Sequence, residues 1–320
     1  MIGLPPGATV VSTVTVRDGQ ASFTHRGTGD AHTRYEIGSV TKTLTVLLLC
    51  DLAAAGVVTL DDPVNRHLPP PARLPGPHGR EVTLRHLAAH TSGLPRVPRD
   101  LYLHALPTLL SAPYARYPGR MLLRAAGRCR IRHAPGSRTG YSTFGIGLLG
   151  EALSRAAGAG WADLIAARVT VPLGLADTGC EQRPARDATG HNTRGRVRPP
   201  FRIPGLAPAG ALRSTVTDLG RYLAAWLDPD GSPLAAAVRL ATTAQIGWEH
   251  DGDLRWHSGA TPGFTAFAGF CPPRRTAFAA LTDATPGRDS IVTPAFEMLE
   301  GTAVSRWSSS PDRRSDVDGG

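Results

Sequence analysis

The chain has 320 residues, of which 41% are hydrophobic and 19% are charged, and its formal net charge is +9. This length predicts one or two packed units, and the composition excludes a wholly disordered chain. The sequence holds no run of 18 apolar residues, and its start shows no signal-peptide pattern, so we expect no membrane contact and a cytoplasmic protein, or a secreted one if the true start lies upstream. Four separated cysteines without a CxxC pair predict reduced thiols and no metal knot: Cys50, Cys129, Cys180 and Cys271.

The first part of the chain predicts a hairpin and a buried helix. Residues 9–17 alternate and are rich in Val and Thr, and after Asp18-Gly19 a second segment, 20–25, completes a β-hairpin pattern. Residues 39–55 are apolar nearly all round and are bounded by glycines, which predicts a central buried helix.

The rest of the chain predicts a helical middle followed by strands. Residues up to about 227 indicate short helices and Gly/Pro-rich loops, with a Pro-rich surface loop near 69–77. Longer helices are expected at 144–157 and 216–227, paired strands at 264–270 and 276–281, a last helix at 289–300, and a disordered tail at 306–320.

This order predicts an α/β fold. The N- and C-terminal segments, about 7–60 and 245–303, would pair into one antiparallel sheet flanked by helices, and a mainly helical insert, about 61–244, would lie between them. Together they would form a single domain over 1–305, with a cleft where sheet and insert join.

The sequence Ser39-Val40-Thr41-Lys42 is an S-x-x-K motif at the start of the predicted buried helix. Residues three apart share a helix face, so the amine of Lys42 can reach the hydroxyl of Ser39. The chain has 35 basic residues, and Lys42 is its one lysine. An amine can lose its proton near neutral pH when it is desolvated, whereas a guanidinium cannot, so this lysine is a candidate for proton transfer.

Several motifs in order make the chain resemble the serine β-lactamase and penicillin-binding-protein family. The resemblance is to its class C β-lactamase, D-alanyl-D-alanine carboxypeptidase and esterase branch, and it runs from about Gly7 to Thr302. The motifs are Ser39-Val40-Thr41-Lys42, Leu60-Asp61-Asp62-Pro63-Val64, residues 83–95, Pro135-Gly136-Ser137, Tyr141-Ser142-Thr143, Pro172-Leu173-Gly174-Leu175, residues 210–215 and His257-Ser258-Gly259.

The resemblance implies a role for each site residue and implies no metal or organic cofactor. Ser39 would be the acylated nucleophile and Lys42 its activating partner, while Tyr141 would act as general base and as proton donor to the leaving group. His257 would orient the substrate or support Tyr141. Gly259 would let the substrate approach the strand closely, and the backbone N–H groups of Ser39 and Ala260 would form the oxyanion hole.

One position departs from the family pattern. The family has Asn where this chain has Thr143, and that Asn helps to bind the substrate amide. A hydroxyl cannot supply both an amide donor and an amide carbonyl. The sequence therefore favours ester or thioester chemistry over peptide or β-lactam recognition.

The leading expectation is a serine hydrolase that acts through an acyl-enzyme on a small-molecule or short peptide-like ester or amide. The first alternative is an acyltransferase with a thioester donor, and the second is a non-catalytic binding or sensor module on the same fold. Ser92 and Ser258 are rival nucleophiles, but neither has a lysine near it in sequence.

Two further features are candidate binding sites, one for a metal ion and one for an anionic partner. His86 and His90 are four apart, but Leu87 stands where a metalloprotease needs its Glu, so they are expected to be structural. Residues 101–150 contain seven arginines and no Asp or Glu, with Arg120, Arg124 and Arg128 four apart. This stretch is either a solvated helix face or a positive surface for an anionic substrate or an acidic carrier protein. No nucleic-acid motif is present, so no nucleic-acid partner is expected.

Overall fold

The computed structural model describes residues 2–76, 81–101, 114–285 and 291–300. Its largest element is a six-stranded antiparallel sheet in the order β2-β1-β8-β7-β6-β5. Strands from the two ends of the chain are neighbours, with Val14 of β1 opposite Ala279 of β8. The strands are β1 (Val10–Arg17), β2 (Gln20–Gly27), β5 (Glu249–Asp251), β6 (Leu254–Thr261), β7 (Phe264–Cys271) and β8 (Thr276–Thr282).

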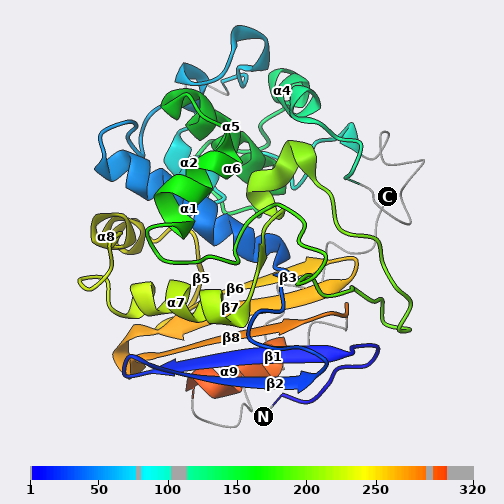
Figure 1. Cartoon of the computed structure of the whole chain (residues 1–320). Helices are drawn as coiled ribbons and strands as arrows, with labels where there is room; N and C mark the ends of the chain where they lie inside the picture. The colour runs from blue at the N-terminus through cyan, green and yellow to red at the C-terminus, as the bar shows by residue number, and fades with distance from the viewer. Residues whose placement is uncertain (1, 77–80, 102–113, 286–290, 301–320) are drawn as a thin grey trace.

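Helices cover both faces of this sheet and fill the middle of the chain (Figure 1). α9 packs on one face against β7 and β8, and α7 packs on the other against β1 and β8. In Figure 1, α4, α5 and α6 of the insert lie above α1, and α7 lies between α1 and the sheet. This arrangement confirms the predicted α/β fold with a helical insert. The helices are α1 (Thr41–Ala54), α2 (Leu84–Ala88), α4 (Gly119–Arg128), α5 (Thr143–Ala157), α6 (Trp161–Ile165), α7 (Val216–Leu227), α8 (Ala235–Ala244) and α9 (Val292–Glu300).

The predicted β-hairpin is present, and its turn explains its sequence. Asp18 and Gly19 both have positive φ, 49° and 79°, which is the conformation of the two central residues in a type I′ turn. This turn matches the right-handed twist of β1 and β2. The hairpin then lies at the edge of the sheet, with β1 paired to β8 on its other side.

α1 is the central helix of the fold, as its apolar sequence predicts. Its side chains from Thr41 to Cys50 are all buried. It contacts α8 on one side and α5 and α6 of the insert on the other. The helix itself begins at Thr41, two residues later than expected, because Gly38–Val40 form a 3₁₀ turn before it.

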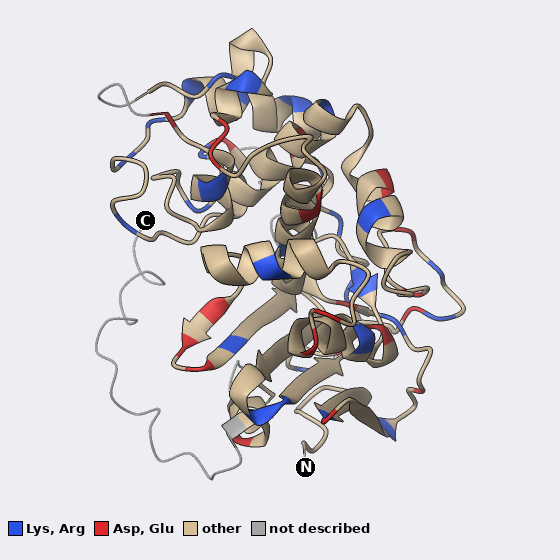
Figure 2. Cartoon of the chain, turned by 90° about the vertical axis from the view of Figure 1, so that its left-hand side faces the viewer, with Lys and Arg blue, Asp and Glu red and all other residues tan. Residues whose placement is uncertain are grey.

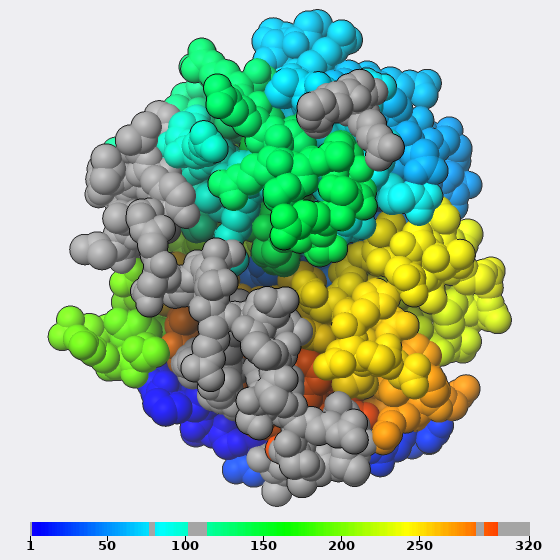
Figure 3. Space-filling model, turned by 180° about the vertical axis from the view of Figure 1, so that it is seen from behind, coloured from blue at the N-terminus to red at the C-terminus, as the bar shows by residue number. Residues whose placement is uncertain are grey.

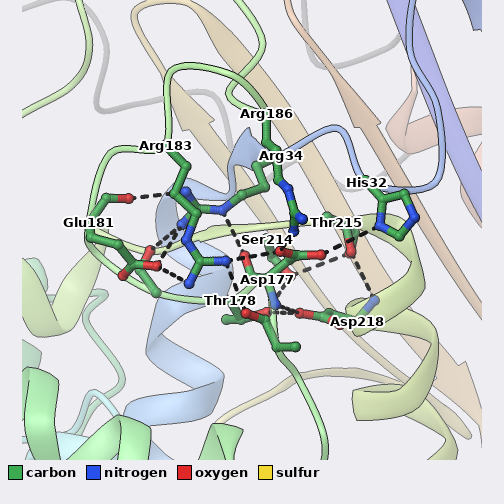
Figure 4. Close-up of polar contacts among 12 residues, drawn as sticks. His32, Arg34, Asp177, Thr178, Glu181, Arg183, Arg186, Ser214, Thr215 and Asp218 are labelled. Atoms are coloured by element: carbon green, nitrogen blue, oxygen red, sulfur yellow. Dashed lines mark hydrogen bonds and ion pairs between the residues drawn. The ribbon is translucent and has the colours of Figure 1, made fainter.

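Two short strands, β3 (Tyr35–Glu36) and β4 (Arg213–Ser214), join the start of the fold to the far end of the insert. A cluster of charged side chains surrounds this join (Figure 4). Arg34 is fully buried; its Nε donates to the carbonyl of Asp177, and its guanidinium pairs with Asp187 at 2.9 Å. These contacts compensate for burying the arginine's charge.

The structure differs from the sequence predictions in two further places. The Pro-rich segment is not wholly a surface loop: Pro70–Ala72 form a 3₁₀ turn against α4, and Ala72 and Leu74 are buried. The last helix begins at Val292. The predicted disordered tail lies outside the described residues. Across the described ranges, we find no helix with the length and apolarity needed to cross a bilayer.

Candidate active site

A cavity of about 480 Å³ lies where the sheet meets the insert. Seen from behind, the cyan to green part of the insert lies above the yellow and orange segments that follow it in the chain (Figure 3). The cavity brings together all seven residues that the sequence analysis selected: Ser39, Lys42, Tyr141, Thr143, His257, Gly259 and Ala260. Three segments far apart in the sequence supply them.

Ser39 and Lys42 are in hydrogen-bond contact. Ser39 lies in the 3₁₀ turn before α1, and the Lys42 amine in the first turn of α1 donates to its Oγ at 2.7 Å. The same amine donates to the carbonyl of Ala209 at 2.7 Å. Burial, and secondarily the positive charge of Arg96, lowers the pKa of Lys42 to about 7. A neutral amine beside Ser39 is therefore well populated at neutral pH.

Basic groups surround the ring of Tyr141. The Lys42 Nζ lies 5.0 Å and the Arg96 guanidinium carbon 5.5 Å from its ring centroid. The imidazole of His90 lies against it at a tilt of 40°, with the ring centroids 4.6 Å apart, and the centroid of His257 lies at 6.1 Å. The phenol thus shares one side of the cavity with the Ser39–Lys42 pair.

Both of these imidazoles are neutral. Burial, with the charge of Lys42 as the second cause, lowers the pKa of His90 and of His257 to about 3. His257 Nδ1 lies 2.7 Å from the carbonyl of Ser258, and a carbonyl only accepts, so Nδ1 carries the proton. The Nε2 of His257 is therefore left as a hydrogen-bond acceptor.

The 3₁₀ turn that holds Ser39 lies directly against β6. A Cβ on Gly38 would stand 2.8 Å from the Ala260 nitrogen, and one on Gly259 would stand 2.0 Å from the Ile37 carbonyl oxygen. Gly259 was expected to be glycine so that substrate could approach. The structure gives it another reason, because the missing side chain makes room for the turn that carries Ser39. The close packing of the 3₁₀ turn against β6 brings Ser39 and Ala260 near each other, and both residues line the cavity.

Thr143 is the first residue of α5, and its neighbours hold it in place. Ser142 caps the helix by accepting from the Gly145 N–H at 2.9 Å, and it donates to the Pro95 carbonyl at 2.7 Å. The Ser142 N–H donates to His90 Nδ1 at 3.2 Å. Hydrogen bonds from Ser142 to His90 and Pro95 therefore fix the segment that contains Tyr141 and Thr143.

The histidine pair considered as a metal site has other contacts. His86 completes a capping box with Thr83 at the start of α2, whereas His90 contacts Tyr141 and Ser142. Within the ranges that the structure describes, no group of three His, Cys, Asp or Glu side chains has metal-binding geometry. Of the rival nucleophiles, Ser92 is buried and Ser258 lines the cavity.

Sequence reasoning missed Arg96, which lines the cavity, and Glu36, a buried residue that contacts Thr261 of the cavity lining. Arg96 lines the cavity and belongs to no motif, so only the three-dimensional structure reveals it. Glu36 is a carboxylate between the apolar Tyr35 and Ile37, which is an unusual place for one and was the available signal. Burial raises its pKa, although Thr261 Oγ1, the Phe201 N–H and Arg213 each donate to it at 2.7 Å.

A second cavity, of about 270 Å³, lies on the other side of Lys42. Lys42, Glu249 and His257 line both cavities, and His90 and His250 line the second. We name it the rear cavity. Lys42 therefore contributes to the lining of both cavities although its side chain is buried.

Comparisons with known proteins identify the family of this chain. The model of the family described as beta-lactamase matches residues 6–301. The D-alanyl-D-alanine-carboxypeptidase/endopeptidase AmpH of Escherichia coli K12 is 31% identical over 195 residues, which cover 61% of this chain and 49% of that protein. A beta-lactamase of the same strain is 29% identical over 234 residues, covering 68% and 57%. Beta-lactamase-like protein 2 of Dictyostelium discoideum is 26% identical over 227 residues, covering 68% and 40%. The chain spans about half the length of these curated relatives.

Proposed function

This chain belongs to the beta-lactamase family of serine hydrolases, and on that premise we propose that it hydrolyses a small ester or amide through an acyl-enzyme on Ser39. The observation that carries the proposal is the 2.7 Å contact between Ser39 Oγ and Lys42 Nζ, in a cavity that also contains Tyr141. A serine is a weak nucleophile until a neighbouring base removes its proton.

In the first step the neutral amine of Lys42 accepts the proton of Ser39 Oγ as that oxygen attacks the acyl carbon. The N–H groups of Ser39 and Ala260, two residues that line the cavity, stabilise the negative charge that develops on the substrate oxygen in this proposal. The tetrahedral intermediate then expels the leaving group, and Ser39 remains acylated.

Tyr141 supplies the proton that the leaving group needs. Its ring lies 5.0 Å from the Lys42 amine, and Arg96 lies on the same ring. These two cations favour negative charge on the phenol oxygen, so the tyrosine can release its proton and take one back from Lys42. Water then hydrolyses the acyl-enzyme with the same groups acting in reverse.

We favour an ester over a peptide or β-lactam substrate. Thr143 lines the cavity at the position where the family's amide-binding Asn is expected, and its hydroxyl replaces only part of an amide's hydrogen bonding. The remaining wall includes Tyr114, Phe201, Ile203 and Trp256, which suits an apolar acyl group.

The test is intact-protein mass after exposure to a fluorophosphonate and, separately, to a penicillin, with Ser39→Ala as the control. We expect one fluorophosphonate adduct that is absent from Ser39→Ala, and slower or no labelling by the penicillin. Equal labelling by the penicillin would favour a peptide-like substrate. An adduct that persists in Ser39→Ala, or no adduct from either reagent, would refute the proposed nucleophile, and no adduct at all would favour a binding module.

If the hydrolase labels as expected, product analysis separates hydrolysis from acyl transfer. A thioester substrate is incubated with and without an added alcohol or amine acceptor. Free acid as the product in both reactions supports a hydrolase. Transfer of the acyl group to the acceptor in preference to water would support the acyltransferase alternative.

A further inference from the structure

A third cavity, of about 260 Å³, lies on the insert and shares no lining residue with the catalytic cavity. We call it the arginine cavity. Its lining includes four arginines and one carboxylate: Arg99, Arg124, Arg128, Arg130 and Asp100. Apolar groups, among them Met121 and Phe144, line the rest. Three chain segments meet here: the one after Arg96, α4 with its C-terminal extension, and the start of α5.

Within the part of the chain that the structure describes, the four arginines outnumber the single carboxylate of the cavity lining, Asp100. In the parts of the chain that the structure describes, none of them forms an ion pair with a carboxylate. The nearby Asp100 already accepts a hydrogen bond of 2.8 Å from the Tyr117 hydroxyl. Residues 101–150 also contain no Asp or Glu, and Figure 2 shows blue segments on the helices of the insert. All four arginines are exposed, so water and salt screen part of their mutual repulsion, and an anion that bridges them would remove the rest.

The arrangement of these arginines suits a phosphate. Arg124 and Arg128 are four apart on α4 and therefore share a helix face, and Arg99 and Arg130 approach from outside the helix. A guanidinium binds phosphate oxygens through two parallel N–H donors, so several of them can enclose a group with several oxygens. The apolar part of the lining would then contact a carbon-bearing portion of the same ligand.

We propose that the arginine cavity binds a small phosphorylated molecule with at least two negative charges and a short apolar portion. The volume is below the range of about 300–1,000 Å³ that holds drug-sized ligands, which favours a compact head group over a large cofactor. The concave shape favours a small ligand over an acidic carrier protein, because protein partners typically dock on a broad surface.

Isothermal titration calorimetry with inorganic pyrophosphate and with an alkyl diphosphate tests the proposal. The wild type should bind both, and the alkyl compound more tightly. The double variant Arg124→Gln/Arg128→Gln should weaken binding at least tenfold. Arg120→Gln is the matched control, because Arg120 lies on the same helix and does not line the cavity, and it should change affinity less than twofold.

Three outcomes would overturn the proposal. The first is no binding of either diphosphate by the wild type. The second is an equal loss of affinity in Arg120→Gln, which would indicate unspecific surface charge. The third is binding of an oligoglutamate peptide but of neither diphosphate, which would favour an acidic protein partner. Fluorophosphonate labelling of Ser39 should proceed at the wild-type rate in all variants, which controls for folding independently of the ligand.

Discussion

Thr261 Oγ1 donates a hydrogen bond of 2.7 Å to the carboxylate of Glu36, and both side chains are buried. Glu36 ends β3 three residues before Ser39, and Thr261 follows Ala260 at the end of β6. Arg213 of β4 donates to the same carboxylate at 2.7 Å. One buried carboxylate therefore holds together the nucleophile segment, the proposed oxyanion strand and the end of the insert.

The first prediction concerns this carboxylate. Replacing Glu36 by Gln leaves the buried guanidinium of Arg213 without its close carboxylate partner, and breaking a buried pair in this way typically costs about 3–5 kcal/mol. We expect Glu36→Gln to lower the free energy of unfolding by about that amount in a urea titration. Glu151→Gln is the control, because Glu151 pairs with Arg155 nearer the surface and should change stability by less than about 1 kcal/mol. Similar effects of both substitutions would contradict the assigned role of Glu36.

The second prediction concerns Gly259. Its added Cβ would stand 2.0 Å from the Ile37 carbonyl oxygen and 3.1 Å from the Ser39 nitrogen, so Gly259→Ala must push the nucleophile turn away from β6. We expect the fluorophosphonate labelling rate to fall at least tenfold and stability to fall by about 1–3 kcal/mol. At Gly119 an added Cβ has no neighbour within 4 Å, so Gly119→Ala should leave both quantities unchanged. A wild-type labelling rate in Gly259→Ala would show that the reactivity of Ser39 does not depend on the close contact between Gly259 and Ile37.

The third prediction is a pH dependence. If neutral Lys42 is the base, the labelling rate rises as the pH increases through its pKa of about 7. The charge of Arg96 is the second cause of that lowered pKa, after burial, so Arg96→Gln should raise the pKa and move the midpoint of the rate profile to higher pH. Arg96→Lys keeps the charge and should keep the midpoint near that of the wild type.

The measurement is the second-order rate of fluorophosphonate labelling between pH 5 and pH 9, chosen to span the pKa of about 7. The midpoint separates an electrostatic effect of Arg96 from simple damage to the cavity, because damage lowers the plateau without moving the midpoint. Coincident midpoints for wild type and Arg96→Gln would contradict the influence of Arg96 on Lys42.

The sequence predicts those parts of the fold whose elements are long and regular. α1 is apolar nearly all round over 14 residues, and β1 alternates over eight, so both follow from their patterns. β3 and β4 have two residues each, and β5 has three, which is too short for any periodicity to appear. Their positions depend on pairing with distant segments, which no local pattern encodes.

The residues of the site also fall into those that local sequence predicts and those that depend on long-range packing. Ser39 and Lys42 are three apart on one chain segment, so helix geometry alone predicts their contact. Tyr141 and His257 were assigned through the resemblance to a family, and their approach to Lys42 depends on how the insert and the sheet meet. Arg96 and Glu36 act through long-range contacts with Tyr141 and Thr261, so they remained invisible until the structure placed them.

The last prediction concerns Thr143, the position that departs from the family pattern. Asn at this position would offer both an amide donor and a carbonyl acceptor to a substrate amide, where threonine offers one hydroxyl. One added hydrogen bond contributes about 1 kcal/mol, so Thr143→Asn should speed acylation by a penicillin about fivefold to tenfold relative to labelling by the fluorophosphonate, which has no amide.

The ratio of the two rates is the decisive quantity, because a general change in Ser39 reactivity alters both rates equally and leaves the ratio constant. Thr139→Asn is the matched control. Thr139 is exposed and lines the rear cavity and not the catalytic one, so the same substitution there should leave the ratio unchanged. An unchanged ratio in Thr143→Asn would mean that the hydroxyl at this position does not set the preference for esters. Other residues that line the catalytic cavity would then determine which substrates react.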